Sequence, residues 1–254
     1  MNRLSLTRET NADRINAVLN DPSVRPFVAD ESEGVLDISR TASDPRNVLL
    51  MGEHGGCMFF WLQPGVYEVH TQVKRDGRGE WTRRLTEACA WWMFTQSDAY
   101  EIVTRVPEGH VAAKTAALAQ GMRHEFTRAA ECLFRGRLGD VSIHSFRIQD
   151  WIADAPWIEE RGAWFHDRLH AEAARLGITG EPHDEDPNHN RYVGAAFEMA
   201  LAGQVVKAVL WYNRWAMVCR HAPIALVSRD PLVIRFDIGL LKIEHGDIEV
   251  LSSC

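Results

Sequence analysis

The first half of the chain contains short runs in which hydrophobic and polar positions alternate. The clearest run covers residues 66–73, where β-branched and aromatic residues dominate and neither Gly nor Pro occurs. This composition predicts a β-strand. Because side chains alternate across a strand, Glu68, His70 and Gln72 are expected on one face of it.

The chain changes to a helical period soon after this strand. Between residues 80 and 94, hydrophobic side chains recur every three or four positions, at Trp81, Leu85, Ala88 and Trp92. This spacing predicts an amphipathic helix. The chain therefore passes from strand to helix through a single short loop.

That loop, residues 74–79, reads Lys-Arg-Asp-Gly-Arg-Gly. Glycines let the backbone turn tightly and approach a ligand. The first N–H groups of the following helix lack internal partners and favour an anion. Two interpretations stay open. The loop is either a pocket for phosphate or pyrophosphate, with added charge from Lys74, Arg75 and Arg78, or a surface turn with solvated charges.

The same patterns predict an element order for the first 138 residues. The order is a strand, two helices, three strands, the basic loop, a helix, a strand, a helix and two strands. The expected strands are 4–7, 47–51, 57–62, 66–73, 100–106, 122–127 and 131–137, and the expected helices are 10–19, 22–28, 80–94 and 110–120. The polar, acidic residues 29–46 are expected to form a loop.

From about residue 139 the pattern changes, although the apolar content continues. Helices are expected at 157–176 and 192–202, and strands at 205–212, 215–218, 224–227, 232–236 and 248–251. We therefore predict two domains, residues 1–138 and 139–254. The second is a smaller α+β domain of unknown role.

A polar loop at residues 180–191 lies between the two helices of this second half. It contains four side chains of metal-ligand type, His183, Asp184, Asp186 and His189. Their spacing matches no standard metal site. We therefore favour an acidic loop that caps the next helix, and we expect no metal.

Composition narrows the classes of function. The chain has 254 residues, of which 46% are hydrophobic and 25% charged, and its net charge is −7. A net negative charge disfavours broad binding to nucleic acid or to an anionic membrane. No apolar run approaches the length of a membrane span, and the start of the chain lacks a signal-peptide core. The five cysteines show no CxxC pair, which favours reduced thiols and a cytoplasmic location.

The element order, with its loop after the fourth strand, resembles the Gcn5-related N-acetyltransferase (GNAT) family. The family's loop pattern is Gln/Arg-x-x-Gly-x-Gly/Ala, and Lys74-x-x-Gly77-x-Gly79 matches it with Lys in the first place. The resemblance implies a mixed, mostly antiparallel sheet flanked by helices, and acetyl-CoA as co-substrate. The implied cofactor-binding residues are Val73, Lys74, Arg75, Gly77, Arg78, Gly79, His110 and Ala113.

The resemblance also implies that the fourth and fifth strands splay, so that residues 100–105 flank the thioester. Two features depart from the family pattern. Where the family often has Asn-x-x-Ala at the start of the next helix, this chain has His110 and Ala113 at the outer positions. Residues 110–121 contain no Tyr to protonate the leaving thiolate. These departures concern catalysis more than the fold.

Transfer of an acetyl group to an amine needs a base that removes a proton from the ammonium group. Glu68 and His70 share one face of the predicted fourth strand, and either can serve as this base. The alternative is structural. In that case His70 is a hydrogen-bonded sheet residue, and Glu68 is a solvated or paired carboxylate.

Two functions therefore stay open. The first is an N-acyltransferase that moves an acetyl group from acetyl-CoA to a small-molecule or protein amine. The second is a catalytically inactive GNAT-like protein that acts through protein contacts, as a homo-oligomer or in a virion. Residues 212–216 resemble bacteriophage-encoded GNAT-like proteins, some of which are associated with the virion. The second half is also open to interpretation as a degenerate GNAT-like unit.

Overall fold

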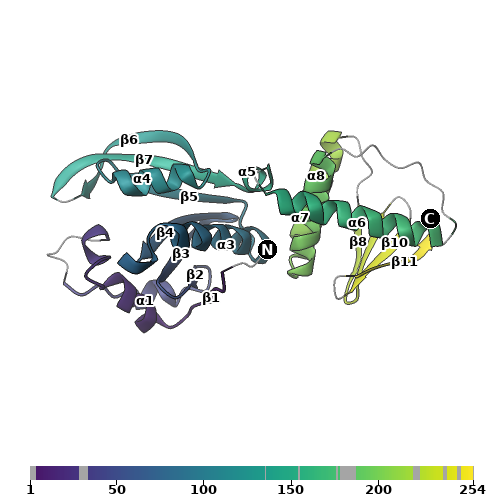
Figure 1. Cartoon of the computed structure of the whole chain (residues 1–254), viewed down its shortest axis with the longest axis horizontal. Helices are drawn as coiled ribbons and strands as arrows, with labels where there is room; N and C mark the ends of the chain where they lie inside the picture. The colour runs from purple at the N-terminus through teal and green to yellow at the C-terminus, as the bar shows by residue number, and fades with distance from the viewer. Residues whose placement is uncertain are drawn as a thin grey trace. The chain divides into compact units, whose positions relative to one another are not determined.

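The structure is a computed structural model of the chain. It describes residues 4–28, 34–134, 136–153, 155–175, 177, 187–219, 224–236, 239–244 and 247–253. The chain forms two compact units (Figure 1). The first comprises residues 1–93 and 99–150, and the second comprises residues 94–98 and 151–254.

The first unit is organised around a seven-stranded sheet of order β1-β2-β3-β4-β5-β7-β6. Its strands are β1 (Thr7–Arg8), β2 (Val48–Met51), β3 (Gly55–Gln63), β4 (Val66–Val73), β5 (Glu101–Pro107), β6 (Arg123–Phe134) and β7 (Arg137–Arg147). Only β4 and β5 pair in parallel, and every other neighbouring pair is antiparallel. The last strand, β7, lies between β5 and β6.

Helices cover both faces of this sheet. They are α1 (Ala12–Leu19), α2 (Ser39–Ala42), α3 (Glu80–Gln96) and α4 (Val111–Ala119), with 3-10 turns at Arg25–Phe27 and Arg75–Gly77. Met58 of β3 belongs to the hydrophobic cluster around α1, whereas the neighbouring Cys57 forms a hydrogen bond with Cys89 of α3. Because adjacent side chains of a strand point to opposite faces, α1 and α3 lie on opposite faces of the sheet.

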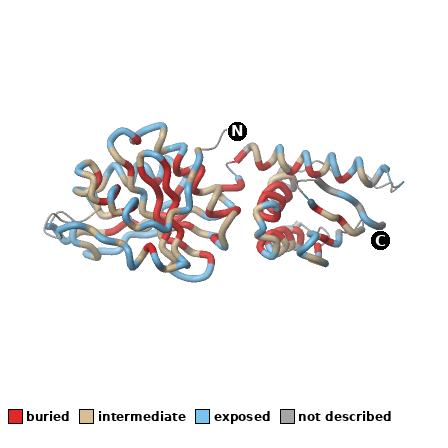
Figure 2. The backbone as a smooth tube through the Cα atoms, turned by 90° about the horizontal axis from the view of Figure 1, so that it is seen from below, coloured by how far each residue is buried: buried red, intermediate tan, exposed pale blue. Residues whose placement is uncertain are grey.

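Local sequence explains where α1 begins. The side chain of Asn11 accepts a hydrogen bond from the N–H of Asp13, which satisfies one of the unpaired donors at the helix start. The helix then buries Ile15, Val18 and Leu19. Figure 2 shows that buried residues run through the middle of the sheet beneath such helices.

The second unit is built from helices and a four-stranded antiparallel sheet. Its main helices are α6 (Pro156–Arg175), α7 (Pro187–Leu201) and α8 (Val205–Cys219), and α5 (Ile148–Ala153) leads into it. The strands β8 (Ala225–Arg229), β9 (Leu232–Phe236), β10 (Gly239–Glu244) and β11 (Asp247–Ser253) follow in the order β11-β10-β9-β8. A Cβ atom on Gly162 would lie 1.8 Å from the carbonyl oxygen of Asn190, so glycine allows α6 and α7 to pack closely.

The predicted fold class is confirmed. The first unit is a mixed, mostly antiparallel sheet flanked by helices, and a smaller α+β unit follows it. The first unit extends to Asp150 rather than to residue 138. The reason is that β7 pairs with both β5 and β6 and so belongs to the first sheet. Residues 180–186 of the expected acidic loop lie outside the described residues, whereas residues 187–191 belong to α7, which begins earlier than the expected residue 192.

Several sequence predictions of elements were wrong. Residues 205–212 and 215–218 were expected to be strands, but they lie in helix α8. The Val-rich start suggested a strand, yet the buried positions Ala208, Trp211, Tyr212 and Ala216 follow a helical period. The two short strands expected at 122–127 and 131–137 form one long strand, β6, and β7 at 137–147 was not predicted. The two strands pair with each other along most of their length.

Candidate functional site

Strands β4 and β5 diverge along their length. They pair only at their first three positions, Val66 with Glu101, Tyr67 with Ile102 and Glu68 with Val103. Both strands then continue without pairing to each other, β4 to Val73 and β5 to Pro107. On their other edges β4 still pairs with β3, and β5 with β7. Beyond Glu68, the β5-facing backbone groups of β4 therefore have no strand partner. This is the splay that the sequence resemblance implies.

Two glycines shape the loop that follows β4. A Cβ atom on Gly77 would lie 2.5 Å from the Cβ atom of His54 and 2.8 Å from a methyl carbon of Val73. Only glycine therefore fits at this position. Gly79 has a φ of +94° and nothing within 4 Å of an added Cβ atom, so its backbone conformation, rather than crowding, selects glycine there.

The start of α3 presents unpaired backbone donors. The N–H of Arg83 donates to the carbonyl oxygen of Gly79, 3.1 Å away. Among the described residues, no group accepts a hydrogen bond from the N–H groups of Gly79, Glu80, Trp81 or Thr82. Such donors, together with the helix dipole, form an anion site.

Basic side chains surround this helix start, and the turn at residues 21–23 holds them. The ammonium of Lys74 lies 3.9 Å from the carboxylate of Asp21. The N–H of Arg75 donates to Ser23 Oγ at 3.1 Å, and the guanidinium of Arg78 donates to the carbonyl oxygen of Ser23. Hydrogen bonds from Ser23, and then the charges of Lys74 and Arg78, hold the pKa of Asp21 below its usual value.

Phe27 links this loop to the start of α4. Its ring lies 5.3 Å from the guanidinium carbon of Arg78 and 5.6 Å from the ring of His110. His110 is the N-cap of α4, because its Nδ1 accepts a hydrogen bond of 3.2 Å from the N–H of Ala113. The loop before α3 and the first turn of α4 therefore lie close to one another.

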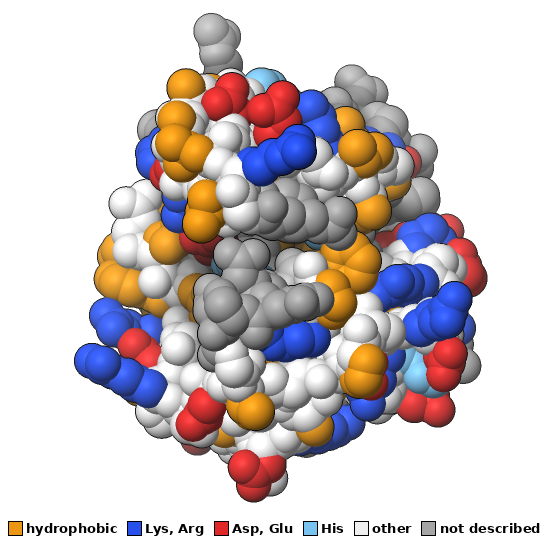
Figure 3. Space-filling model, turned by 90° about the vertical axis from the view of Figure 1, so that its left-hand side faces the viewer, with side chains coloured by type: hydrophobic (Ala, Val, Ile, Leu, Met, Phe, Trp, Pro, Cys, Tyr) orange, Lys and Arg blue, Asp and Glu red, His pale blue; other side chains and the backbone are white. Residues whose placement is uncertain are grey.

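Figure 3 shows this end of the first unit, where α3 and α4 both begin. Lys and Arg, Asp and Glu, and hydrophobic side chains all occur on this face.

Glu68 and His70 form a pair on β4. His70 Nε2 lies 3.1 Å from Glu68 Oε1, and the side chain of Glu68 is 14% exposed whereas that of His70 is 39% exposed. Burial raises the pKa of the Glu68 carboxyl, but the hydrogen bond from His70 and the charges of His70 and Arg105 outweigh it, so this pKa lies below its usual value. Glu68 is therefore an ionised partner for His70.

The pair is positioned at the point where the strands diverge. Glu68 is the last residue of β4 that pairs with β5, and His70 follows two positions later on the same face. Glu68 lies opposite Phe60 of β3, which packs against the hydrophobic cluster of α1. The pair therefore faces the α1 side of the sheet, whereas the Cys57 thiol of β3 faces α3.

The predicted site residues therefore fall into three groups. Glu68 and His70 lie together where β4 and β5 diverge, and Val73 to Gly79 lie at the far end of β4. Phe27 lies between His110 and the loop, and the N–H of Ala113 is already bonded to His110. Sequence reasoning did not identify Ser23 and Phe27, because an isolated turn residue and a single aromatic carry no motif.

The described part of the chain shows neither a metal site nor a membrane-spanning helix. No group of three or more His, Cys, Asp or Glu side chains there is arranged to hold a metal ion. None of the helices described is long and apolar enough to cross a membrane.

No family of known sequences matches this chain, and no curated protein matches it. Solved structures that match include a variant of the spermidine N-acetyltransferase SpeG from Vibrio cholerae, 15% identical, with a TM-score of 0.48, covering 58% of this chain and 97% of that chain. A probable GNAT-family acetyltransferase from Chromobacterium violaceum is 15% identical, with a TM-score of 0.49 and coverage of 59% and 91%. The ribosomal-protein-S5-alanine acetyltransferase from Vibrio fischeri is 12% identical, with a TM-score of 0.48 and coverage of 59% and 96%. At these identities the likeness does not indicate a substrate.

Proposed function

We propose that the first unit is an N-acyltransferase that uses acetyl-CoA to acetylate an amine. This proposal rests on strand β4, which has two relevant features. β4 ends in a glycine loop with unpaired amide donors, and it holds the Glu68–His70 pair where it separates from β5. A diphosphate at the loop and a thioester near the pair suit a long, thin molecule lying between the two strands.

The residues of the loop fit a diphosphate. The N–H groups at the start of α3 supply hydrogen bonds, and Lys74, Arg75 and Arg78 supply positive charge. The absence of a Cβ atom at Gly77 keeps the backbone close to β3 and β4, since any side chain would collide with His54 and Val73. Val73 and Gly79 complete the loop as backbone contacts.

Bound acetyl-CoA supplies a thioester, and its acetyl group passes to the amine with release of the thiol. His70 acts as the base. Its Nε2 donates to Glu68, which leaves Nδ1 to accept the proton of the ammonium group. Glu68 orients the ring and stabilises the imidazolium that forms. The backbone donors of β4 beyond Glu68 are suited to stabilise the charge on the acetyl oxygen.

A second candidate function is favoured by the surface of the second unit. Val206 and Leu210 of α8 are 44% and 59% exposed, and Leu201 of α7 is 41% exposed. Contiguous exposed apolar side chains are typical of protein contacts, and Val206 and Leu210 lie one helical turn apart. The alternative is therefore an inactive GNAT-like protein, encoded by a bacteriophage or another source, that acts in a virion or another assembly.

Thermal unfolding with acetyl-CoA separates the two functions. A ligand at about 100 times its dissociation constant stabilises the folded state by about 2.7 kcal/mol. We expect acetyl-CoA to raise the melting temperature and free thiol to appear when an amine is added. Candidate amines are polyamines, amino acids and protein N-termini. No shift and no thiol, together with co-purification in an assembly, would support the inactive interaction protein.

A further inference from the structure

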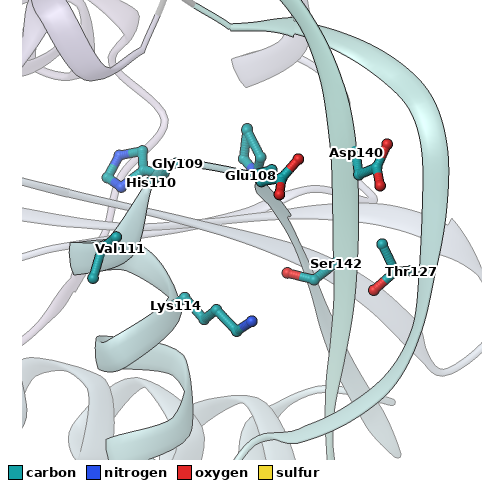
Figure 4. A pocket seen from close by; sticks show the side chains of 9 residues that line it. Glu108, Gly109, His110, Val111, Lys114, Thr127, Asp140 and Ser142 are labelled. Carbon is teal, nitrogen blue, oxygen red and sulfur yellow. The ribbon is translucent and has the colours of Figure 1, made fainter.

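A cavity of about 260 Å³ lies between the first turn of α4 and the strands β6 and β7 (Figure 4). The acyl-transfer proposal makes no use of it. Its polar lining residues are Glu108, His110, Lys114, Thr127, Asp140 and Ser142. They come from the end of β5, from α4 and from the final hairpin of the sheet, so three separate parts of the chain build this cavity.

One part of the cavity carries negative charge. Glu108 forms no ion pair or side-chain hydrogen bond with any residue that the structure describes. Its N–H donates to the carbonyl oxygen of Asp140 at 2.7 Å, so the main chains of the two acidic residues are in contact. Asp140 Oδ1 accepts a hydrogen bond of 3.0 Å from the N–H of Ala130. Asp140 Oδ2 has no partner among the described residues, so both carboxylates keep free acceptor oxygens.

The other part favours an anion. Lys114 has no ion-pair partner among the described residues, and Figure 4 shows its side chain extending toward Ser142. At the start of the nine-residue helix α4, no described group accepts from the N–H groups of Val111 and Ala112. A lysine ammonium beside free N–H groups at a helix start attracts a carboxylate or another anion.

The wall behind these groups is polar but uncharged. Ser142 Oγ donates to the carbonyl oxygen of Val106 at 3.2 Å and lies 3.2 Å from Nε2 of the fully buried His144. Burial, and then the charges of His124 and Lys114, lower the pKa of His144, so its imidazole stays neutral at pH 7. The wall therefore adds no charge that would neutralise the acidic part or the basic part of the cavity.

We infer that this cavity binds a small zwitterion, a molecule with an ammonium group for Glu108 and Asp140 and an anionic group for Lys114 and the start of α4. A ligand with one charge would form only one of the two sets of charged contacts, which lowers its affinity. The inference does not depend on acyl transfer, because it concerns residues outside the Glu68–His70 pair and the diphosphate loop.

Calorimetric titration of the full chain tests the inference. The probes are glycine, β-alanine, γ-aminobutyrate and ε-aminocaproate, which differ only in the spacing of their two charges. Butylamine, butyrate and inorganic phosphate carry one type of charge. At up to about 10 mM, a millimolar dissociation constant gives near-saturation. We expect one binding site for at least one zwitterion, with about tenfold weaker binding of every single-charge probe.

Single substitutions then test whether Glu108 and Lys114 bind the zwitterion. Glu108→Gln and Lys114→Met should each weaken zwitterion binding about tenfold, which corresponds to about 1.4 kcal/mol. Glu53→Gln and Lys242→Met, the same changes outside the cavity, should leave it unchanged. The inference is overturned if no zwitterion binds saturably, if phosphate, butyrate or butylamine binds as tightly, or if Glu108→Gln and Lys114→Met bind like the parent chain. Melting temperatures of the variants verify folding, and both side chains lie at the surface.

Discussion

At the residue scale, the chemistry of the proposed site depends on two side chains that are two positions apart. Alternation along a strand places Glu68 and His70 on one face, and the structure adds the 3.1 Å contact between them. That contact leaves different roles to the two residues. In the proposed mechanism, the ionised Glu68 is the orienting partner and His70 is the base.

Replacing His70 by Gln should lower kcat for acetyl transfer by about 10²–10⁴-fold, because the proton acceptor is lost. Acetyl-CoA affinity should stay the same, since His70 lies on β4 before the diphosphate loop and makes none of the proposed contacts with the diphosphate. Steady-state kinetics and a thermal-shift titration measure the two quantities. His170→Gln, on the exposed side of α6, is the matched control. Unchanged kcat in His70→Gln would remove His70 from the mechanism.

Alanine substitutions at the two loop glycines, Gly77 and Gly79, should have different effects. Gly77→Ala should destabilise the protein by about 1–3 kcal/mol, because the added Cβ atom meets His54 and Val73. It should also abolish the acetyl-CoA thermal shift. Gly79→Ala should cost only about 1 kcal/mol, because space is free and only the positive φ is unfavourable.

Urea unfolding gives the stability of each variant, and thermal shift gives the binding. Equal destabilisation by the two substitutions would contradict the tight packing at Gly77. Normal acetyl-CoA binding in both variants would contradict the assignment of the loop.

At the element scale, α8 and the end of α3 are joined by buried polar contacts within the second unit. The Lys207 ammonium donates to the carbonyl oxygens of Phe94 and Ser97 at 2.8 and 2.9 Å, and Gln204 donates to that of Gln96 at 3.1 Å. The last carbonyls of a helix lack partners within it. These side chains therefore cap the C-terminal end of α3. Burial of apolar residues alone would leave these carbonyl oxygens without a hydrogen bond.

Lys207 should make stability depend on pH. Burial lowers its pKa to about 7, against the opposing charge of Asp98, whereas in the unfolded chain the pKa returns to its ordinary 10.5. Between these values the unfolded chain binds more protons than the folded one, so the free energy of unfolding rises with pH. Urea unfolding between pH 7 and pH 10 should show this rise, and Lys207→Met should lack this component. Parallel pH profiles would contradict it.

The elements also show where sequence patterns reach their limit. The helical period of α3 is strong because the helix buries one face, and the composition of β4 is strong because β-branched and aromatic residues dominate it. Both elements were predicted. Helix α8 was read as strands because its first residues, Val205 and Val206, are β-branched, a preference that tertiary packing overrides. The insertion of β7 between β5 and β6 is a pairing of distant segments, which no local pattern encodes.

At the scale of the whole molecule, the two units should respond differently to cofactor. Hydrogen exchange with and without acetyl-CoA should show slower exchange in residues 66–82 and 100–105, which contain the proposed contacts. Peptides from residues 187–219 should be unchanged, because no proposed contact lies there. Protection confined to the second unit would contradict the proposed cofactor site.

The sequence by itself determined the order of elements in the first unit, the strand-loop-helix device around Gly77 and Gly79, and the shared face of Glu68 and His70. These features follow from periods of two and 3.6 residues and from local backbone chemistry. Only the tertiary structure decided at which residue β4 and β5 separate, that Phe27 lies between Arg78 and His110, and that Glu108, Lys114 and Asp140 line one cavity. Each of these depends on contacts between residues far apart in the chain, and such contacts arise from packing of the whole sheet rather than from any local pattern.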